Sequence, residues 1–138
     1  MGTFTSAFKA LSDPTRLRAL RMILIAGEPL CVCELVDALS LPQYQVSKHL
    51  AVLRQAGLVT DTRVGTWVYY SAVGEPDEFT AGLYDLVRKH VDSPTFREDV
   101  ERLRARMALR EEGLCPPGPE RAASRTKRPG APRLARRS

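Results

Sequence analysis

The chain has 138 residues, which suffices for one domain and is too short for two ordinary ones. It contains no run of about 18 apolar residues, so we expect no transmembrane helix and no contact with a membrane. Its first residues lack the charged and apolar regions of a signal peptide, so we expect a cytoplasmic protein. The formal net charge of +5 comes from residues 116–138, where seven Lys or Arg and one Glu give +6 and leave residues 1–115 at −1. Nucleic-acid binding by the rest of the chain would therefore depend on a local cationic surface.

Helical periodicity and capping residues divide the first part of the chain into four predicted helices. Asp13 is a good N-cap and Pro14 a good first helical residue, while Gly27 is a good stop signal. Pro29 predicts the start of a short third helix, and Gly57 the end of a fourth. We expect helices at 4–11, 14–26, 29–39 and 43–56.

The predicted faces of these helices follow from the spacing of their apolar residues. The second helix directs its leucines and Ile23 inward and should expose Arg16, Arg18 and Arg21 to solvent. The third and fourth helices are short and joined by a tight turn, which is typical of a helix-turn-helix.

A hairpin and two further helices are predicted after the fourth helix. Residues 58–63 and 66–71 are rich in β-formers and flank Val64-Gly65, so we expect a two-stranded wing. Helices should follow at 78–91 and 95–112. Beyond Gly113 the composition changes to Pro, Ala, Gly and Arg, which predicts a disordered basic tail over 113–138 after a domain at 1–112. The tail either adds nonspecific phosphate contacts or only increases solubility.

Four motifs of this chain resemble those of the ArsR/SmtB family of metalloregulatory repressors, and more narrowly its arsenic-responsive branch. They are Ser12–Leu17, Cys31–Leu35 with its Cys-Val-Cys sequence, Val46–Val59 and Gly65–Tyr70. The resemblance covers residues 4 to 112. It implies a mainly α fold with a small β-hairpin, that is, a winged helix-turn-helix with a helical dimer interface. It also implies a homodimer that leaves operator DNA when As(III) or Sb(III) binds, with no organic cofactor.

Two positions depart from the family pattern. Val36 occupies the place where the arsenic branch often has a third cysteine, which puts a three-thiolate site on that helix in doubt. Pro42 precedes the fourth helix where a capping serine is common, and it pre-sets the backbone instead.

The cysteines are the main candidate ligands. Cys31 and Cys33 are two residues apart, so on a regular helix their side chains would point about 200° apart. We therefore expect that binding both sulfurs to one ion distorts the first helical turn. Soft thiolates favour As(III), Sb(III), Cd(II) or Pb(II) over Mg or Ca. Cys115 is a candidate third ligand, in its own or the partner subunit, or a bystander thiol.

Four other interpretations of the cysteine pair stay open. The two residues can be small buried hydrophobic residues, or the thiols of a Cd/Pb sensor or a redox-sensing repressor, although a disulfide between residues two apart needs strained geometry. A small thiol oxidoreductase is a further alternative. The chain has no phosphate-binding glycine loop or nucleophile–base motif, so we do not expect an enzyme.

The start of the fourth helix supplies the predicted DNA-reading residues, because the first residues of a recognition helix approach base edges. Amides can pair with adenine, and Ser or Lys can reach a base or a phosphate. Arg54 and Arg63 are candidates for backbone phosphates, and Thr66 lies at the wing tip. We expect His49 and the hairpin aromatics to pack in the core. The alternative for the polar residues at the start of the fourth helix is that they form a solvated face with no DNA contact. The base-edge candidates are Gln43, Tyr44, Gln45, Ser47 and Lys48.

Overall fold

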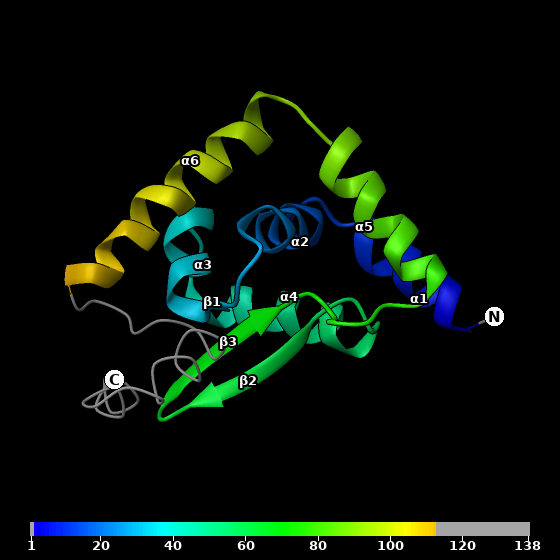
Figure 1. The fold of residues 1–138 in the computed structure, drawn as a ribbon, viewed down its shortest axis with the longest axis horizontal. Helices are drawn as coiled ribbons and strands as arrows, with labels where there is room; N and C mark the ends of the chain where they lie inside the picture. The colour runs from blue at the N-terminus through cyan, green and yellow to red at the C-terminus, as the bar shows by residue number, and fades with distance from the viewer. Residues whose placement is uncertain (1, 113–138) are drawn as a thin grey trace.

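The computed structural model describes residues 2–112, and it confirms a mainly helical fold with a small antiparallel sheet. The last two helices lie over α2, and the sheet and α4 lie on the other side of it (Figure 1). The elements in chain order are α1 (Gly2–Leu11), α2 (Pro14–Ala26), β1 (Leu30–Cys31), α3 (Val32–Leu39), α4 (Gln43–Gln55), β2 (Thr60–Val64), β3 (Trp67–Ser71), α5 (Glu78–His90), α6 (Pro94–Ala108) and the 3-10 turn η1 (Leu109–Glu112).

The predicted boundaries of α2 are confirmed, and side-chain capping explains them. The Asp13 carboxylate accepts hydrogen bonds from the backbone N–H groups of Thr15 at 2.8 Å and Arg16 at 3.1 Å. These bonds satisfy two of the donors that a helix start leaves unpaired. Gly27 ends the helix with φ 68°, a left-handed conformation that glycine adopts without strain.

The core forms around α2, which packs against α1, α4, α5 and α6. The apolar stripes predicted for α2 and α4 are buried there, which confirms their orientation. They include Leu20, Ile23, Leu24, Val46, Leu50 and Leu53.

The arginines of α2 do not face solvent, so that prediction was wrong. Arg21 is only 8% exposed and donates to the carbonyl oxygens of Val91 at 2.7 Å and Phe96 at 3.1 Å. Arg18 is half-buried and makes a two-pronged ion pair with Asp99 of α6. These guanidinium groups are buried because α5, α6 and the segment between them cover α2, and sequence periodicity cannot show that coverage.

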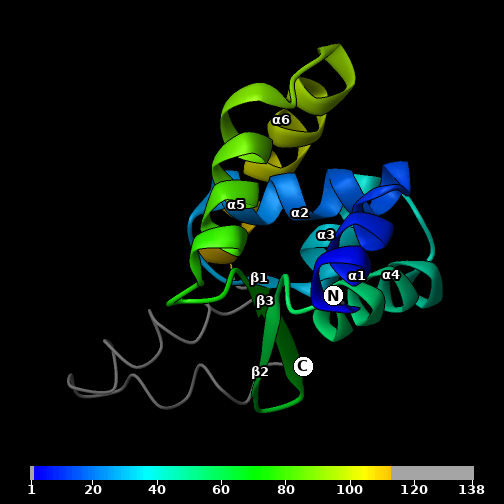
Figure 2. The same ribbon diagram turned by 90° about the vertical axis from the view of Figure 1, so that its right-hand side faces the viewer.

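The sheet has the strand order β1-β3-β2, with all neighbours antiparallel. Strands β2 and β3 form the predicted wing, which projects from the rest of the described chain in both views (Figures 1 and 2). The strand β1 was not predicted. Leu30 and Cys31 pair with Tyr70 and Tyr69, so α3 begins at Val32 and not at Pro29 as expected.

Among the helices of residues 2–112, none is both long and apolar enough to cross a membrane. The predicted tail at 113–138 lies outside the described residues, and so does Cys115.

Candidate functional site

Cys31 joins the sheet to α3. It is the N-cap of α3, with φ −69° and ψ 147°, and its strand pairing places it opposite Tyr69 of the wing. Its backbone N–H donates to Oε1 of Glu34 at 2.9 Å. Its side chain is buried against Tyr69. Cys31 therefore has extended backbone geometry and lies outside the helix that contains Cys33.

The two sulfur atoms of the pair are adjacent, with 2.9 Å between Sγ of Cys31 and Sγ of Cys33. The expectation of side chains about 200° apart was wrong, because Cys31 is not in a helical turn. The distance exceeds the roughly 2.05 Å of a disulfide bond, so the two sulfurs are not joined to each other. One ion bonded to both at about 2.3 Å would hold them roughly 3.3–3.8 Å apart. The pair therefore fits a shared soft ion after a small opening, and no unwinding of the first turn is required.

Cys33 is half-buried and lies beside a cation. Nη2 of Arg106, on α6, is 3.4 Å from its sulfur, and a guanidinium in that place favours a thiolate. Burial alone would lower the pKa of the Arg106 guanidinium, but its hydrogen bond to Asp37 and the charges of Cys33, Asp37 and Glu34 raise that pKa above its ordinary value.

No third ligand joins the pair from the part of the chain that the structure describes. Within residues 2–112 there is no group of three His, Cys, Asp or Glu side chains arranged to hold a metal ion. Val36 is partly buried and packs against the main core.

The predicted DNA-reading residues lie at the start of α4, and the structure divides them into two sets. Tyr44 is 66% exposed, Lys48 is also exposed, and Gln45 lies between them with its Nε2 atom 3.5 Å from the Tyr44 hydroxyl. Gln43 and Ser47, four residues apart and so on one side of the helix, line a cavity together with residues of the wing instead.

A cavity of about 390 Å³ brings the second set together with the cysteine pair. It lies between α4, the wing and the beginning of α3, and Trp67, Val68 and Tyr70 also line it. Tyr44, Gln45 and Lys48 do not. Its predicted site residues are Cys31, Cys33, Gln43, Ser47, Arg54, Arg63 and Thr66.

Arg54 and Arg63 differ in their surroundings. Nη1 of Arg54 is 3.1 Å from a carboxylate oxygen of Asp61 on β2, and both side chains are exposed. An exposed ion pair of this kind contributes little stability and is easily exchanged for another anion. Arg63 is exposed on β2, within the same cavity.

The aromatic residues of the hairpin pack, as predicted. Tyr69 is 1% and Tyr70 7% exposed, and burial raises the pKa of the Tyr70 hydroxyl. Trp67 is partly buried, and its Nε1 atom has no hydrogen-bond partner among the described residues. His49 is half-buried with Nδ1 3.4 Å from Nη1 of Arg16, which agrees with an inward orientation.

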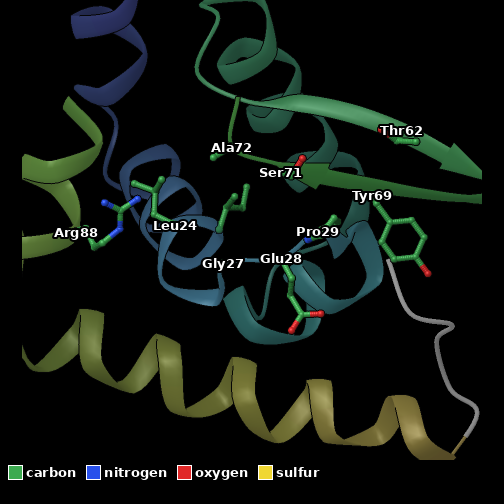
Figure 3. Close-up of a pocket in the computed structure, with 10 residues that line it drawn as sticks. Leu24, Gly27, Glu28, Pro29, Thr62, Tyr69, Ser71, Ala72 and Arg88 are labelled. Carbon is green, nitrogen blue, oxygen red and sulfur yellow. The ribbon is translucent and has the colours of Figure 1, made fainter. Parts of the chain in front are cut away.

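A second cavity, of about 250 Å³, lies between the end of α2, the sheet and α5 (Figure 3). None of its lining residues was predicted as a site residue. Its two charged groups already have partners, because Glu28 pairs with Arg110 and Arg88 pairs with Asp85. The 390 Å³ cavity is the stronger candidate site.

An exposed aromatic surface joins α1 to α5. The rings of Phe4 and Phe8 contact the ring of Phe79 edge-on, with centroids 4.7 and 5.7 Å away. Phe4 is nevertheless 44%, Phe8 58% and Leu86 51% exposed. Large apolar side chains gathered in this way are typical of a protein–protein contact.

The arginines of α6 and η1 that contact α3 near the two cysteines were not predicted as site residues. Arg102, Arg106 and Arg110 recur every fourth residue, which is the signal that they share one helix face. Nothing local indicates that this face meets α3.

Comparison with known proteins identifies related sequences and folds. Residues 13–61 match the family model described as bacterial regulatory protein, arsR family. The arsenic resistance transcriptional regulator ArsR1 of Pseudomonas putida is 56% identical over 63 residues, which cover 46% of this chain and 48% of that protein. The chain thus spans about half the length of that relative.

Two further matches cover a larger share of the related protein. The putative arsenical resistance operon repressor ArsR2 of Halobacterium salinarum is 38% identical over 87 residues, covering 63% of this chain and 70% of that protein. The solved structure of reduced HlyU from Vibrio cholerae is 32% identical with a TM-score of 0.55, over 66% of this chain and 92% of HlyU.

Proposed function

Because the chain belongs to the ArsR family of bacterial regulatory proteins, we propose that it is a cytoplasmic transcriptional repressor controlled by a trivalent metalloid. In this proposal a homodimer binds operator DNA and releases it when As(III) or Sb(III) binds Cys31 and Cys33. One observation carries the proposal. The two sulfurs are 2.9 Å apart and line the same cavity as the predicted DNA-facing residues of α4 and the wing.

The DNA interface we propose consists of α4 and the wing. Tyr44, Gln45 and Lys48 project from the exposed side of α4 and supply groups that can read base edges. The sugar-phosphate backbone of the DNA would be contacted from the cavity side. The residues there are Gln43, Ser47 and the wing residues Arg63 and Thr66. Arg54 joins them when a phosphate replaces Asp61 as its partner.

The homodimer we propose pairs through α1 and α5. The exposed rings of Phe4 and Phe8 together with Leu86 form an apolar surface that a second copy would cover. Two copies would present two recognition helices to two half-sites of an operator.

The ligand set we propose contains Cys31, Cys33 and Cys115. Cys115 follows Arg110 by five residues, and Arg110 binds Glu34 beside the cysteine pair. Five residues span at most about 18 Å, and we propose that Cys115 reaches the pair of its own or of the partner subunit. Three sulfurs suit As(III) or Sb(III), which prefer soft donors.

Release follows from the location of the two sulfurs on different elements. Cys31 belongs to β1, which pairs with the wing strand β3, whereas Cys33 belongs to the first helix of the helix-turn-helix. An ion bonded to both sulfurs fixes the distance between α3 and the wing. If that distance differs from the one in the DNA-bound conformation, the ion binds the DNA-bound conformation less tightly than the free one. Binding of the ion then weakens DNA binding, since only differential affinity shifts an equilibrium.

The experiment that tests this function uses a DNA fragment from upstream of the protein's own gene. We expect As(III) and Sb(III) to release the fragment at lower concentrations than Cd(II), Pb(II) or Zn(II), in a gel-shift titration of the full chain. Failure of both metalloids to release bound DNA would contradict the proposal.

A redox-sensing repressor is the second candidate, and the sulfur separation favours it as well. The sulfurs would need to approach by less than about 1 Å to form a disulfide. Release of DNA by diamide in the absence of any metalloid, and its reversal by dithiothreitol, would support this alternative.

A further inference from the structure

Two arginines of α6 and one of the following turn η1 bind α3 through their side chains. The helix α6 runs beside α3 (Figure 1). Nε of Arg102 donates to a backbone carbonyl at 2.8 Å, and Arg106 and Arg110 donate to carboxylates. Their spacing of four residues puts Arg102 and Arg106 on one face of α6, and Arg110, four residues further on, lies in η1. The groups they bind on α3 are, in the same order, Ala38, Asp37 and Glu34.

Arg110 is connected to the segment around Cys31 and Cys33 through a buried carboxylate. Its Nε and Nη2 atoms donate to the two carboxylate oxygens of Glu34, which is fully buried, and Nη2 also donates to the carbonyl of Pro29 at 2.9 Å. Oε1 of Glu34 accepts the backbone N–H of Cys31 as well. One carboxylate thus connects η1, which follows α6, to the residue that precedes α3.

This connection determines where α3 begins. The side chain of Glu34, at the third helical position, takes the N–H of the N-cap residue, as in a capping box, and this bond holds Cys31 in extended geometry. Were Cys31 to enter the helix, the two cysteine side chains would diverge by about 200°. The proximity of the sulfurs therefore depends on Glu34, and the orientation of Glu34 depends on Arg110.

Arg106 fixes the other sulfur. Its side chain is 11% exposed, its Nε atom donates to Asp37, and its Nη2 atom lies 3.4 Å from Sγ of Cys33. The sulfur of Cys31 is thus held through its backbone, by Glu34 and Arg110 of η1, and the sulfur of Cys33 directly, by Arg106 of α6.

We propose that Arg106 and Arg110 are positioning residues of the thiol site, which keep the two sulfurs adjacent so that one bifunctional ligand can engage both. The inference rests on the proposed function, because it concerns the same cysteine pair. It assigns to α6 and η1 a part in ligand capture, although neither contains a cysteine.

The test measures sulfur proximity without a metalloid, by the rate at which dibromobimane cross-links the pair. Each thiolate displaces one bromide, and the product fluoresces only when both ends have reacted. The full chain carries Cys115→Ser so that two thiols remain. In the variant Glu34→Gln with Arg110→Met, the two charges of the fully buried pair are removed together, so neither of them stays buried without its partner. Glu28, whose side chain is 28% exposed, also loses its ion pair with Arg110. The control is Arg104→Met, at an exposed arginine on the α2 side of α6.

We expect the double variant to cross-link about tenfold more slowly, because reaction at the second sulfur depends on its prior orientation. Its single alkylation by iodoacetamide and its helical circular dichroism should stay close to the wild type. Arg106→Met should slow cross-linking too, and Arg106→Lys should restore part of it. As(III) affinity should fall in parallel.

Wild-type cross-linking rates in the folded double variant and in Arg106→Met would overturn the inference. If the double variant does not fold, the cross-linking rates of Arg106→Met and Arg106→Lys test the inference, because Arg106 is not part of the Glu34 pair. Equal wild-type rates in both would overturn it. A chain whose cross-linking falls as expected but whose DNA is insensitive to As(III) would refute the proposed function and leave the positioning role standing.

Discussion

At the scale of single residues, buried carboxylates attach α6 to the rest of the fold. Asp99 is 1% exposed and accepts from Arg18 of α2 at 3.0 and 2.9 Å and from Arg102 of its own helix at 2.6 Å. Glu34 of α3 has the same role for Arg110 of η1, just after the end of α6. A buried carboxylate is favourable only while its cationic partners remain, so each of these residues is sensitive to substitution.

We expect Asp99→Asn to destabilise the fold by about 2–4 kcal/mol, because it leaves the half-buried guanidinium of Arg18 without its counter-charge. Urea unfolding monitored by circular dichroism measures the change. The control is Asp85→Asn, which breaks an exposed ion pair with Arg88 and should cost less than about 0.5 kcal/mol. Equal stability losses in the two variants would show that Asp99 does not anchor α6.

At the scale of elements, we propose that the thiol pair acts between α3 and the wing and that α4 reads DNA. We expect Gln45→Ala with Lys48→Ala to weaken operator binding at least about tenfold, since one base contact contributes roughly 1–3 kcal/mol. Fluorescence anisotropy with labelled operator measures the affinity, and thiol titration confirms that the cysteines are intact. The control is Lys89→Ala, an exposed lysine of α5. Wild-type affinity in the double variant would mean that another face contacts DNA.

The sequence predicts most of these elements but not how the cysteines meet. The apolar stripes of α2 and α4 and the caps at Asp13 and Gly27 are local signals, and the structure agrees with them. The strand β1 has two residues and exists only through its pairing with β3, far along the chain. The sulfur geometry therefore had no local signal.

The contacts of α6 were equally beyond local prediction. The burial of Arg18 and Arg21 depends on the packing of α5, α6 and the segment between them against α2. The hydrogen bonds of Arg110 to Glu34 depend on the packing of α6 and η1 against α3. The regular spacing of the α6 arginines was visible, but the identity of the helix they contact was not.

At the scale of the whole molecule, the proposed binding of an operator requires two copies of the chain. We expect Phe8→Asp to shift the protein toward the monomer, because it puts a charge into the apolar surface shared by α1 and α5. Sedimentation velocity measures the assembly state. Tyr44→Asp is the matched control, since Tyr44 is an exposed aromatic residue on α4 and should leave the dimer intact. A fully dimeric Phe8→Asp variant would place the interface elsewhere.

The most direct measurement compares the operator affinity of the same protein with and without saturating As(III), in the wild type, in Cys33→Ser and in Cys115→Ser. We predict that As(III) weakens wild-type binding by roughly 5- to 150-fold, the usual range of coupling between two sites. Cys33→Ser should bind operator normally and ignore As(III), while Cys115→Ser should keep part of the response. A wild-type dimer that holds As(III) at Cys31 and Cys33 and still binds its operator with unchanged affinity would contradict the account.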